Sequence, residues 1–150
     1  EPKPDPQIYA IPVRKDRLIA FVDRDHTWAR RRSVKLEELA QEQIVLRETG
    51  SITRAIFERA LERNDIQLET TLEIGSREAV REAVASGLGV GIVFESEFSR
   101  DPRVHALSLR GARLEAVEYA ACLEDRHPLR VVRAFFDLAR ETQPDLHDRV

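Results

Sequence analysis

Apolar strand-like segments alternate with amphipathic helical segments through the middle of the chain, and no other feature limits the possible fold so strongly. Ile44–Leu46 reads as a short buried strand, and a helix is predicted over residues 49–63. A strand at 68–74, a helix at 76–87 and a buried strand at Val90–Phe94 follow. This alternation predicts parallel strands joined by crossover helices, which is an α/β architecture.

Further elements are expected on both sides of this core. They are two early strands, a short helix, two late strands and a final helix, over Ile8–Val13, Arg17–Val22, Ser33–Leu39, 104–109, 114–123 and 129–140. A charged turn at 14–16 separates the two early strands, and Ser33 caps the short helix. Two helices are expected to bury one apolar stripe each, formed by Ile52, Ala55, Ile56, Ala60 and Leu61 and by Val132, Phe135, Phe136 and Ala139.

Length, charge and cysteine content narrow the class of protein. The 150 residues suit about one ordinary domain, and a net charge of -3 makes this segment a poor candidate for gripping nucleic acid. No apolar run reaches the roughly 20 residues that a membrane helix needs. A single cysteine, Cys122, fits a reducing compartment, so we expect a cytoplasmic protein. The chain opens without Met on an alternating proline segment, which predicts that it starts inside a longer gene product.

Hydroxyl groups and a glycine gather where the helix over 49–63 begins. Thr49, Gly50, Ser51 and Thr53 stand at a strand-to-helix junction, where unpaired backbone N–H groups bind anions. Gly50 allows close approach of a ligand to the backbone. Ordinary capping by Ser51 is the alternative interpretation of the same residues.

A second junction repeats this geometry. Ser76 opens the next helix, and parallel strands would bring both helix N-termini to the same edge of the sheet, where ligands of open α/β sheets bind. Phe94 and Glu95 end a strand on that edge, and Glu95 is a candidate partner for an ammonium group. Capping by Ser76 and a purely surface role for Glu95 are the alternatives.

Catalytic, metal and cofactor sites have no positive support in the sequence. The glycines of Gly87–Gly91 follow a helix and precede a strand, which reverses the order of a dinucleotide fingerprint. Asp23, Asp25 and His26 lack a second ligand cluster, so a solvated loop is expected there. Cys122 lies in an apolar strand and is expected to be a small buried thiol. We therefore expect no enzyme, no cofactor and no metal.

Several short motifs, in this order and spacing, resemble the effector-binding domain of LysR-type transcriptional regulators over about residues 8–140. The matching segments are Asp16–Val22, His26, Val34–Ala40, Gly50–Arg54, Glu73–Val80, Val84–Val93, Asp101–Val104 and Leu107–Leu109. The resemblance implies a fold like that of type II periplasmic binding proteins, with a small metabolite bound between two α/β lobes. It also implies a DNA-binding domain that this chain lacks, and a homodimer or homotetramer.

The resemblance further implies a division of the chain. Residues 1–14 would be a linker and connecting strand, 15–117 the second lobe, and 118–150 a connecting strand and C-terminal helix of the first lobe. Gly50, Ser51, Thr53 and Ser76 match positions that line the effector cleft in the family. Two segments depart from the family pattern, at His26–Trp28 and at Phe94–Glu95.

These observations predict a metabolite-sensing part of a bacterial transcription factor. Its effector would be small and anionic, and would also carry an amine, as in a phosphonate or an amino-acid-like compound, if Glu95 faces the cleft. The alternative is a periplasmic-type solute-binding protein for a small anion. A third reading, a dehydratase-like enzyme on the same fold, lacks an acid/base pair.

Overall fold

The computed structural model describes residues 5–112 and 114–142, and the chain divides into two units. Residues 17–115 form what we call the central unit, and residues 1–16 with 116–150 form the flanking unit, both named for their places in the sequence. The expected start of the linker and end of the last segment fall on residues 1–4 and 143–150, outside the described residues.

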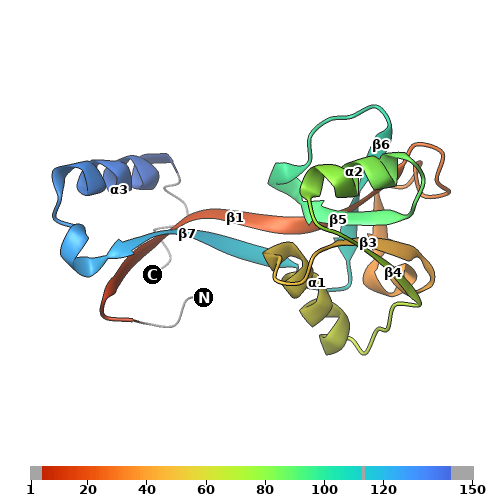
Figure 1. Cartoon of the computed structure of the whole chain (residues 1–150), viewed down its shortest axis with the longest axis horizontal. Coiled ribbons are helices and arrows are strands. Elements are labelled where there is room, and N and C mark those ends of the chain that lie inside the picture. The colour runs from red at the N-terminus through yellow and green to blue at the C-terminus, as the bar shows by residue number, and fades with distance from the viewer. Residues whose placement is uncertain (1–4, 113, 143–150) are drawn as a thin grey trace. The chain divides into compact units, whose positions relative to one another are not determined.

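Strands and helices occupy most of the described chain (Figure 1). The strands are β1 (Ile8–Asp23), β2 (Ser33–Lys35), β3 (Gln43–Arg47), β4 (Thr70–Ile74), β5 (Val90–Phe94), β6 (Val104–Arg110) and β7 (Glu115–Leu123). The helices are α1 (Ile52–Arg63), α2 (Arg77–Ala85) and α3 (Arg130–Thr142), with short 3-10 turns η1 (Leu36–Gln41), η2 (Glu95–Glu97) and η3 (Glu124–Arg126). The sheet order is β2-β6-β1-β5-β3-β4, and β7 pairs with β1.

The centre of the sheet has the predicted parallel arrangement. Strand β3 pairs in parallel with both β4 and β5, and α1 and α2 connect these strands. The carboxyl ends of β3, β4 and β5 therefore share one edge, where α1, α2 and η2 begin. Strand β1 instead runs antiparallel to β5 and β6, which helix–strand alternation alone did not predict.

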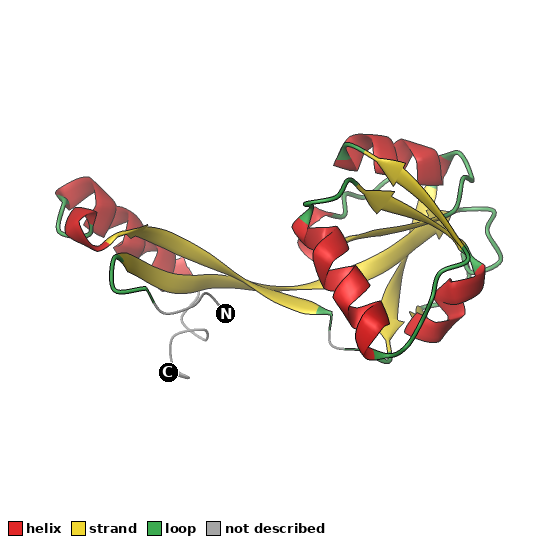
Figure 2. Cartoon of the chain, turned by 60° about the horizontal axis from the view of Figure 1, so that its bottom comes forward, coloured by secondary structure: helices red, strands yellow, loops and turns green. Residues whose placement is uncertain are grey.

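Helices cover the sheet of the central unit (Figure 2). Helix α2 packs Val80, Ala83 and Val84 into a buried cluster with Ile19, Phe21, Val45 and Val93. The chain moves outward from β3 to β4 and back past β3 to β5, so right-handed crossovers place α1 and α2 on opposite faces. Alternate residues of the same strands are also buried, which gives the sheet a core on both sides.

The predicted apolar stripe of α1 is confirmed at Ala60 and Leu61 and is wrong in the first two turns, where the buried face is displaced by one residue. The buried residues are Thr53, Phe57, Ala60 and Leu61, whereas Ile52 is 65% exposed. Both sets follow helical spacing, and packing selects the face that carries the large Phe57 ring. This choice places the Thr53 side chain inward at the first turn of the helix.

The charged turn predicted at 14–16 does not form, because β1 continues through it without interruption. Arg14 and Lys15 are exposed on the strand, and Arg14 contacts Glu118 of β7 at 2.6 Å. Strand pairing satisfies the backbone there, and the Arg14 and Lys15 side chains reach solvent without a turn, whereas Asp16 is buried.

The short helix predicted from Ser33 also begins later than expected. Residues Ser33–Lys35 form β2, which pairs in parallel with β6. The helical turn η1 starts at Leu36, and the Glu38 carboxylate accepts a hydrogen bond from the Lys35 N–H at 2.8 Å. Among the expected apolar residues of α3, only Phe136 is fully buried, and Phe135 is 57% exposed.

Candidate functional site

The two helix N-termini at the carboxyl edge differ in how they use their hydroxyl groups. Ser76 caps α2, because its Oγ accepts a hydrogen bond from the Ala79 N–H at 3.1 Å. Ser51 stands at the equivalent position of α1 but makes no side-chain cap hydrogen bond. Capping therefore accounts for Ser76 and does not account for Ser51, although both side chains are half-buried.

The other predicted residues have distinct surroundings. Thr49 and Gly50 are exposed, and Gly50 has a φ of +97°, which only glycine adopts without strain. Thr53 is 7% exposed, and Phe94 is buried in the core. Glu95 is exposed, and both its carboxylate oxygens accept hydrogen bonds from Arg17, at 2.7 and 2.8 Å.

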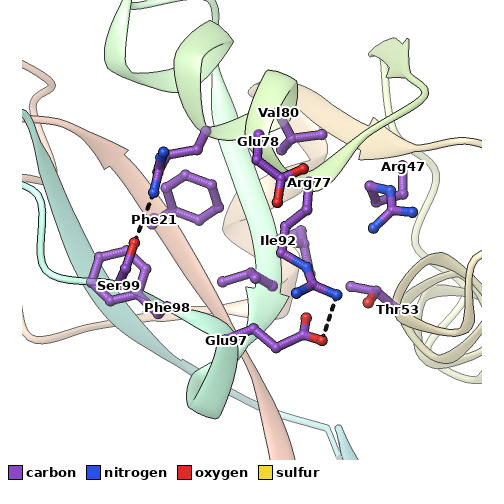
Figure 3. A pocket seen from close by; sticks show the side chains of 12 residues that line it. Phe21, Arg47, Thr53, Arg77, Glu78, Val80, Ile92, Glu97, Phe98 and Ser99 are labelled. Carbon is purple, nitrogen blue, oxygen red and sulfur yellow. Dashed lines mark hydrogen bonds and ion pairs between the residues drawn. The ribbon is translucent and has the colours of Figure 1, made fainter.

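A pocket of about 170 Å³ lies at the carboxyl edge of the sheet, next to Thr53. All the residues that line it belong to the central unit (Figure 3). Five of its residues are apolar and form what we call the floor: Phe21, Val80, Ile92, Val93 and Phe98. The others are polar or charged and form the rim: Arg47, Thr53, Arg77, Glu78, Arg81, Glu97 and Ser99. Of the seven predicted site residues, only Thr53 lines this pocket.

Local sequence explains where the rim residues come from. Arg47 ends β3, and Arg77, Glu78 and Arg81 occupy the first turns of α2, where one helical turn separates the two arginines. Glu97 ends η2, and Ser99 follows shortly after. In Figure 3 the Arg77 side chain extends toward Glu97 and Thr53.

Each of the three arginines of the rim contacts a carboxylate or hydroxyl group of the same chain. The Arg77 Nη2 lies 2.7 Å from Glu97, and the Arg81 Nη1 donates to the Ser99 Oγ at 2.8 Å. Arg47 Nε donates to the Glu48 carboxylate at 2.7 Å, and this hydrogen bond lowers the pKa of Glu48 to about 2. The same pairing raises the pKa of Arg47.

One donor of the rim remains unsatisfied. The Arg81 Nε is buried without a hydrogen-bond partner among the described residues, and a carboxylate oxygen of Glu82 lies 3.8 Å away, beyond hydrogen-bond distance. Buried donors of this kind are normally satisfied by a solvent or ligand atom. The rim also carries three arginines against two glutamates, so its balance favours an anion.

Sequence reasoning missed the arginines of this site, although a signal was present. Basic residues are unfavourable in the first turn of a helix, because they oppose the helix dipole. Arg77 occupies that position in α2. Together with Arg47 at the end of the neighbouring strand β3, it indicated a cluster of cations at the carboxyl edge of the sheet.

No group of three or more His, Cys, Asp or Glu side chains with metal-binding geometry occurs among residues 5–112 and 114–142. No helix in the described part of the chain is long and apolar enough to cross a membrane. His26 is half-buried in its loop, where its Nδ1 accepts a hydrogen bond from the Trp28 N–H at 3.1 Å and its Nε2 lies 3.6 Å from Glu42.

This mixed α/β unit carries its charged pocket at the carboxyl edge of its parallel strands, which is where open α/β sheets bind ligands. The LysR substrate binding domain family matches residues 1–144, and the chain belongs to this family. Its fold is the type II periplasmic-binding-protein-like fold, as the resemblance had implied.

Relatives among known proteins are transcriptional regulators. The RuBisCO operon transcriptional regulator of Acidithiobacillus ferrooxidans is 32% identical over 106 residues, which are 69% of this chain and 34% of that protein. The HTH-type transcriptional activator CmpR of Synechocystis is 34% identical over 76 residues, or 51% of this chain and 25% of that protein. The chain thus spans about a quarter to a third of the length of these relatives.

Solved structures share the fold. The regulatory domain of Synechocystis CcmR, in complex with 2-PG, superimposes with a TM-score of 0.82 at 22% identity, covering 97% of this chain and 72% of that one. The effector-binding domain of QuiR, in complex with shikimate, gives a TM-score of 0.77 at 21% identity, with coverage of 97% and 70%.

Proposed function

We propose that this chain is the effector-sensing part of a bacterial LysR-type transcriptional regulator, and that its effector is a small anion. The observation that carries the proposal is the pocket at the carboxyl edge, with three arginines against two glutamates at its rim. The unused Ser51 hydroxyl and the N-terminus of α1 lie on the same edge. The solved relatives with bound 2-PG and shikimate support an effector-binding role.

The predicted amine on the effector receives less support from the geometry. Glu95 was its proposed partner, and the Arg17 guanidinium engages both oxygens of this carboxylate. An ammonium group would have to share Glu95 with Arg17. We therefore propose an anion for which an amine is not required.

We further propose the arrangement of the whole protein. Residues 15–117 act as the second lobe, residues 1–14 are a linker and connecting strand, and residues 118–150 are a connecting strand and the C-terminal helix of the first lobe. The whole protein is a non-enzymatic, cytoplasmic homodimer or homotetramer. DNA is bound through a domain outside these residues. The effector acts by population shift. A ligand that binds one arrangement of the lobes more tightly favours that arrangement, and this changes the geometry of the oligomer that binds DNA.

The test is DNA binding by the whole protein encoded by the gene, measured by fluorescence anisotropy with and without candidate anions. We expect at least one organic anion to change the affinity for the gene's own promoter region. The double variant Ser51→Ala with Thr53→Ala should weaken that response about tenfold, since Thr53 lines the pocket and the Ser51 hydroxyl, which makes no cap hydrogen bond, stands at the same helix N-terminus. Thr70→Ala, at the opposite end of β4, is the matched control. An unchanged response in the double variant would contradict the proposed site.

A further inference from the structure

The pocket of the central unit combines features that a site for a purely hydrophilic anion does not need. Its floor of aromatic and branched side chains offers apolar contact, and its rim offers guanidinium groups. A phosphate or sulfate ion would contact only the rim, and the apolar floor would remain exposed to water. A ligand that uses both parts has a charged group at one end and an apolar body at the other.

We propose that this pocket binds an organic carboxylate with an apolar body of about one ring, and that the ligand carboxylate replaces Glu97 on Arg77. The inference rests on the proposed effector-sensing role of the central unit. It adds to that role the chemical class of the ligand and the residue pair that exchanges when the ligand binds.

The size of the pocket sets the size of the apolar body. A cavity of about 150 Å³ lined by apolar side chains holds one benzene ring in a protein interior. The pocket here measures about 170 Å³, so one six-membered ring or a short branched chain fills it. Larger bodies would have to displace Phe21 or Phe98.

The Arg77–Glu97 contact is suited to exchange. Arg77 is 48% exposed and Glu97 is 24% exposed, and ion pairs with this much solvent contact contribute little to stability. A ligand carboxylate offers Arg77 the same charge and the same planar geometry as Glu97. Glu97 would remain solvated after release, because it ends the short turn η2 at the surface.

Neighbouring groups favour the same orientation. The pocket residues Thr53 and Arg77 come from the first turns of two helices whose N-termini share the carboxyl edge, so both helix dipoles attract a negative group there. The buried Arg81 Nε supplies a donor that lacks an acceptor among the described residues. The floor residues Val80 and Phe98 leave the opposite end of the pocket apolar.

The experiment measures binding to the full chain by isothermal titration calorimetry, with benzoate as the probe. Acetate and sulfate carry the charge without the ring, and benzamide carries the ring without the charge. We expect benzoate to bind at least about tenfold more tightly than any of the three. Arg77→Gln should weaken benzoate about tenfold or more, since it removes the guanidinium that pairs with the carboxylate.

Glu97→Gln provides the sharper readout, because a purely structural role would not produce its effect. This variant removes the internal competitor for Arg77, so benzoate affinity should rise about three- to tenfold. Glu38→Gln is the matched control: Glu38 pairs with Arg31 at 2.7 Å outside the pocket, and its loss should leave benzoate affinity unchanged. Circular dichroism verifies that each variant folds, and if Arg77→Gln does not fold, Glu97→Gln decides.

Absence of saturable benzoate binding, or an affinity that Glu97→Gln fails to raise, overturns this inference. If benzoate did not bind but another anion still altered DNA binding through Ser51 and Thr53, the pocket inference would be wrong and the proposed regulatory function would stand. Conversely, tight benzoate binding that rises in Glu97→Gln, without any effect of anions on DNA binding, would support the pocket and contradict the proposed regulatory function.

Discussion

Helices α2 and α3 both carry apolar residues at helical spacing, but the two units that contain them use these residues differently. In the central unit, α2 buries Val80, Ala83 and Val84 against the sheet. In the flanking unit, α3 leaves Val131, Phe135 and Leu138 exposed by 83%, 57% and 60%. These three residues lie at i, i+4 and i+7 and form one continuous face.

The surroundings of the two helices explain this contrast. The central unit contains a sheet with a helix on each side, and all six glycines of the chain. In the flanking unit, α3 packs one buried residue, Phe136, against Tyr9 and His127, whose rings stack with centroids 3.8 Å apart. Arg140 adds a hydrogen bond to the Tyr9 hydroxyl.

Amphipathic spacing does not by itself determine burial. A helix buries its apolar face only where a second layer supplies matching surface. An exposed face of three large apolar residues is typical of a surface that meets another part of a protein. The contrast therefore predicts different responses to equivalent substitutions in the two units.

The largest difference should come from replacing one phenylalanine in each unit. Phe57→Ala removes a fully buried ring from α1 and should lower the free energy of unfolding by about 3–5 kcal/mol. Phe135→Ala removes a ring that is 57% exposed and should change it by less than about 0.5 kcal/mol. Urea unfolding followed by circular dichroism measures both values. Equal losses would show that α3 is covered in solution and would remove the contrast.

A smaller effect is expected from overpacking the core of the central unit. A Cβ at Gly91 would lie 2.4 Å from the Phe21 ring, so Gly91→Ala should cost about 1–3 kcal/mol of unfolding free energy. A Cβ at Gly75 meets nothing within 4 Å, and Gly75→Ala is the control, expected within about 0.5 kcal/mol. Thermal unfolding distinguishes the two. A tolerated Gly91→Ala would mean that the sheet–α2 contact is loosely packed.

Acid should weaken the central unit through its ion pairs. Hydrogen bonds from Arg47 and Arg103 lower the pKa of Glu48 from 4.5 and of Asp101 from 3.8, both to about 2. Since these pKa values are depressed, the stabilisation is present above the ordinary values and is lost as pH falls from about 4.5 toward 2.

Fluorescence of Trp28, which is buried in the central unit, follows this transition. The double variant Glu48→Gln with Asp101→Asn should lose less stability than the wild type between pH 5 and pH 2. A parallel decline in both proteins would show that other carboxyls control acid unfolding.

The smallest predicted effect concerns Cys122 in the flanking unit. Desolvation raises the pKa of this thiol, and Glu124 and Asp125 raise it further. Less thiolate is then present at pH 8, so alkylation by iodoacetamide should be slower than for an unstructured cysteine peptide. Mass spectrometry of timed samples measures the rate. Alkylation as fast as in the peptide would indicate that β7 does not keep its pairing with β1.

The sequence predicted the fold more completely than it predicted the candidate site. It found β3, α1, α2 and β5 to within a few residues, and Gly87 has the expected left-handed φ of +76°. It missed the unbroken β1 and the strand β2, because both carry charged or hydroxyl residues that also favour turns and caps. Their strand state depends on pairing with distant segments of the chain.

At the candidate site, the sequence indicated the edge but not the pocket. Thr53 was expected there and lines the pocket, whereas Arg47, Arg77 and Arg81 were not expected. Two of these arginines come from α2 and one from β3, and only the crossover connections bring them around a common apolar floor. A motif read along the chain cannot show that convergence.

Local sequence is sufficient to predict the alternation of strand and helix, the parallel order of β3, β4 and β5, and the shared edge of their carboxyl ends. These properties follow from periodicity and from right-handed crossovers, which are local rules. The tertiary structure alone decided which face of α1 is buried, which hydroxyl caps its helix and which cations surround the pocket. Those outcomes depend on the surface that each element meets, because burial and ion pairing are properties of contacts between distant residues.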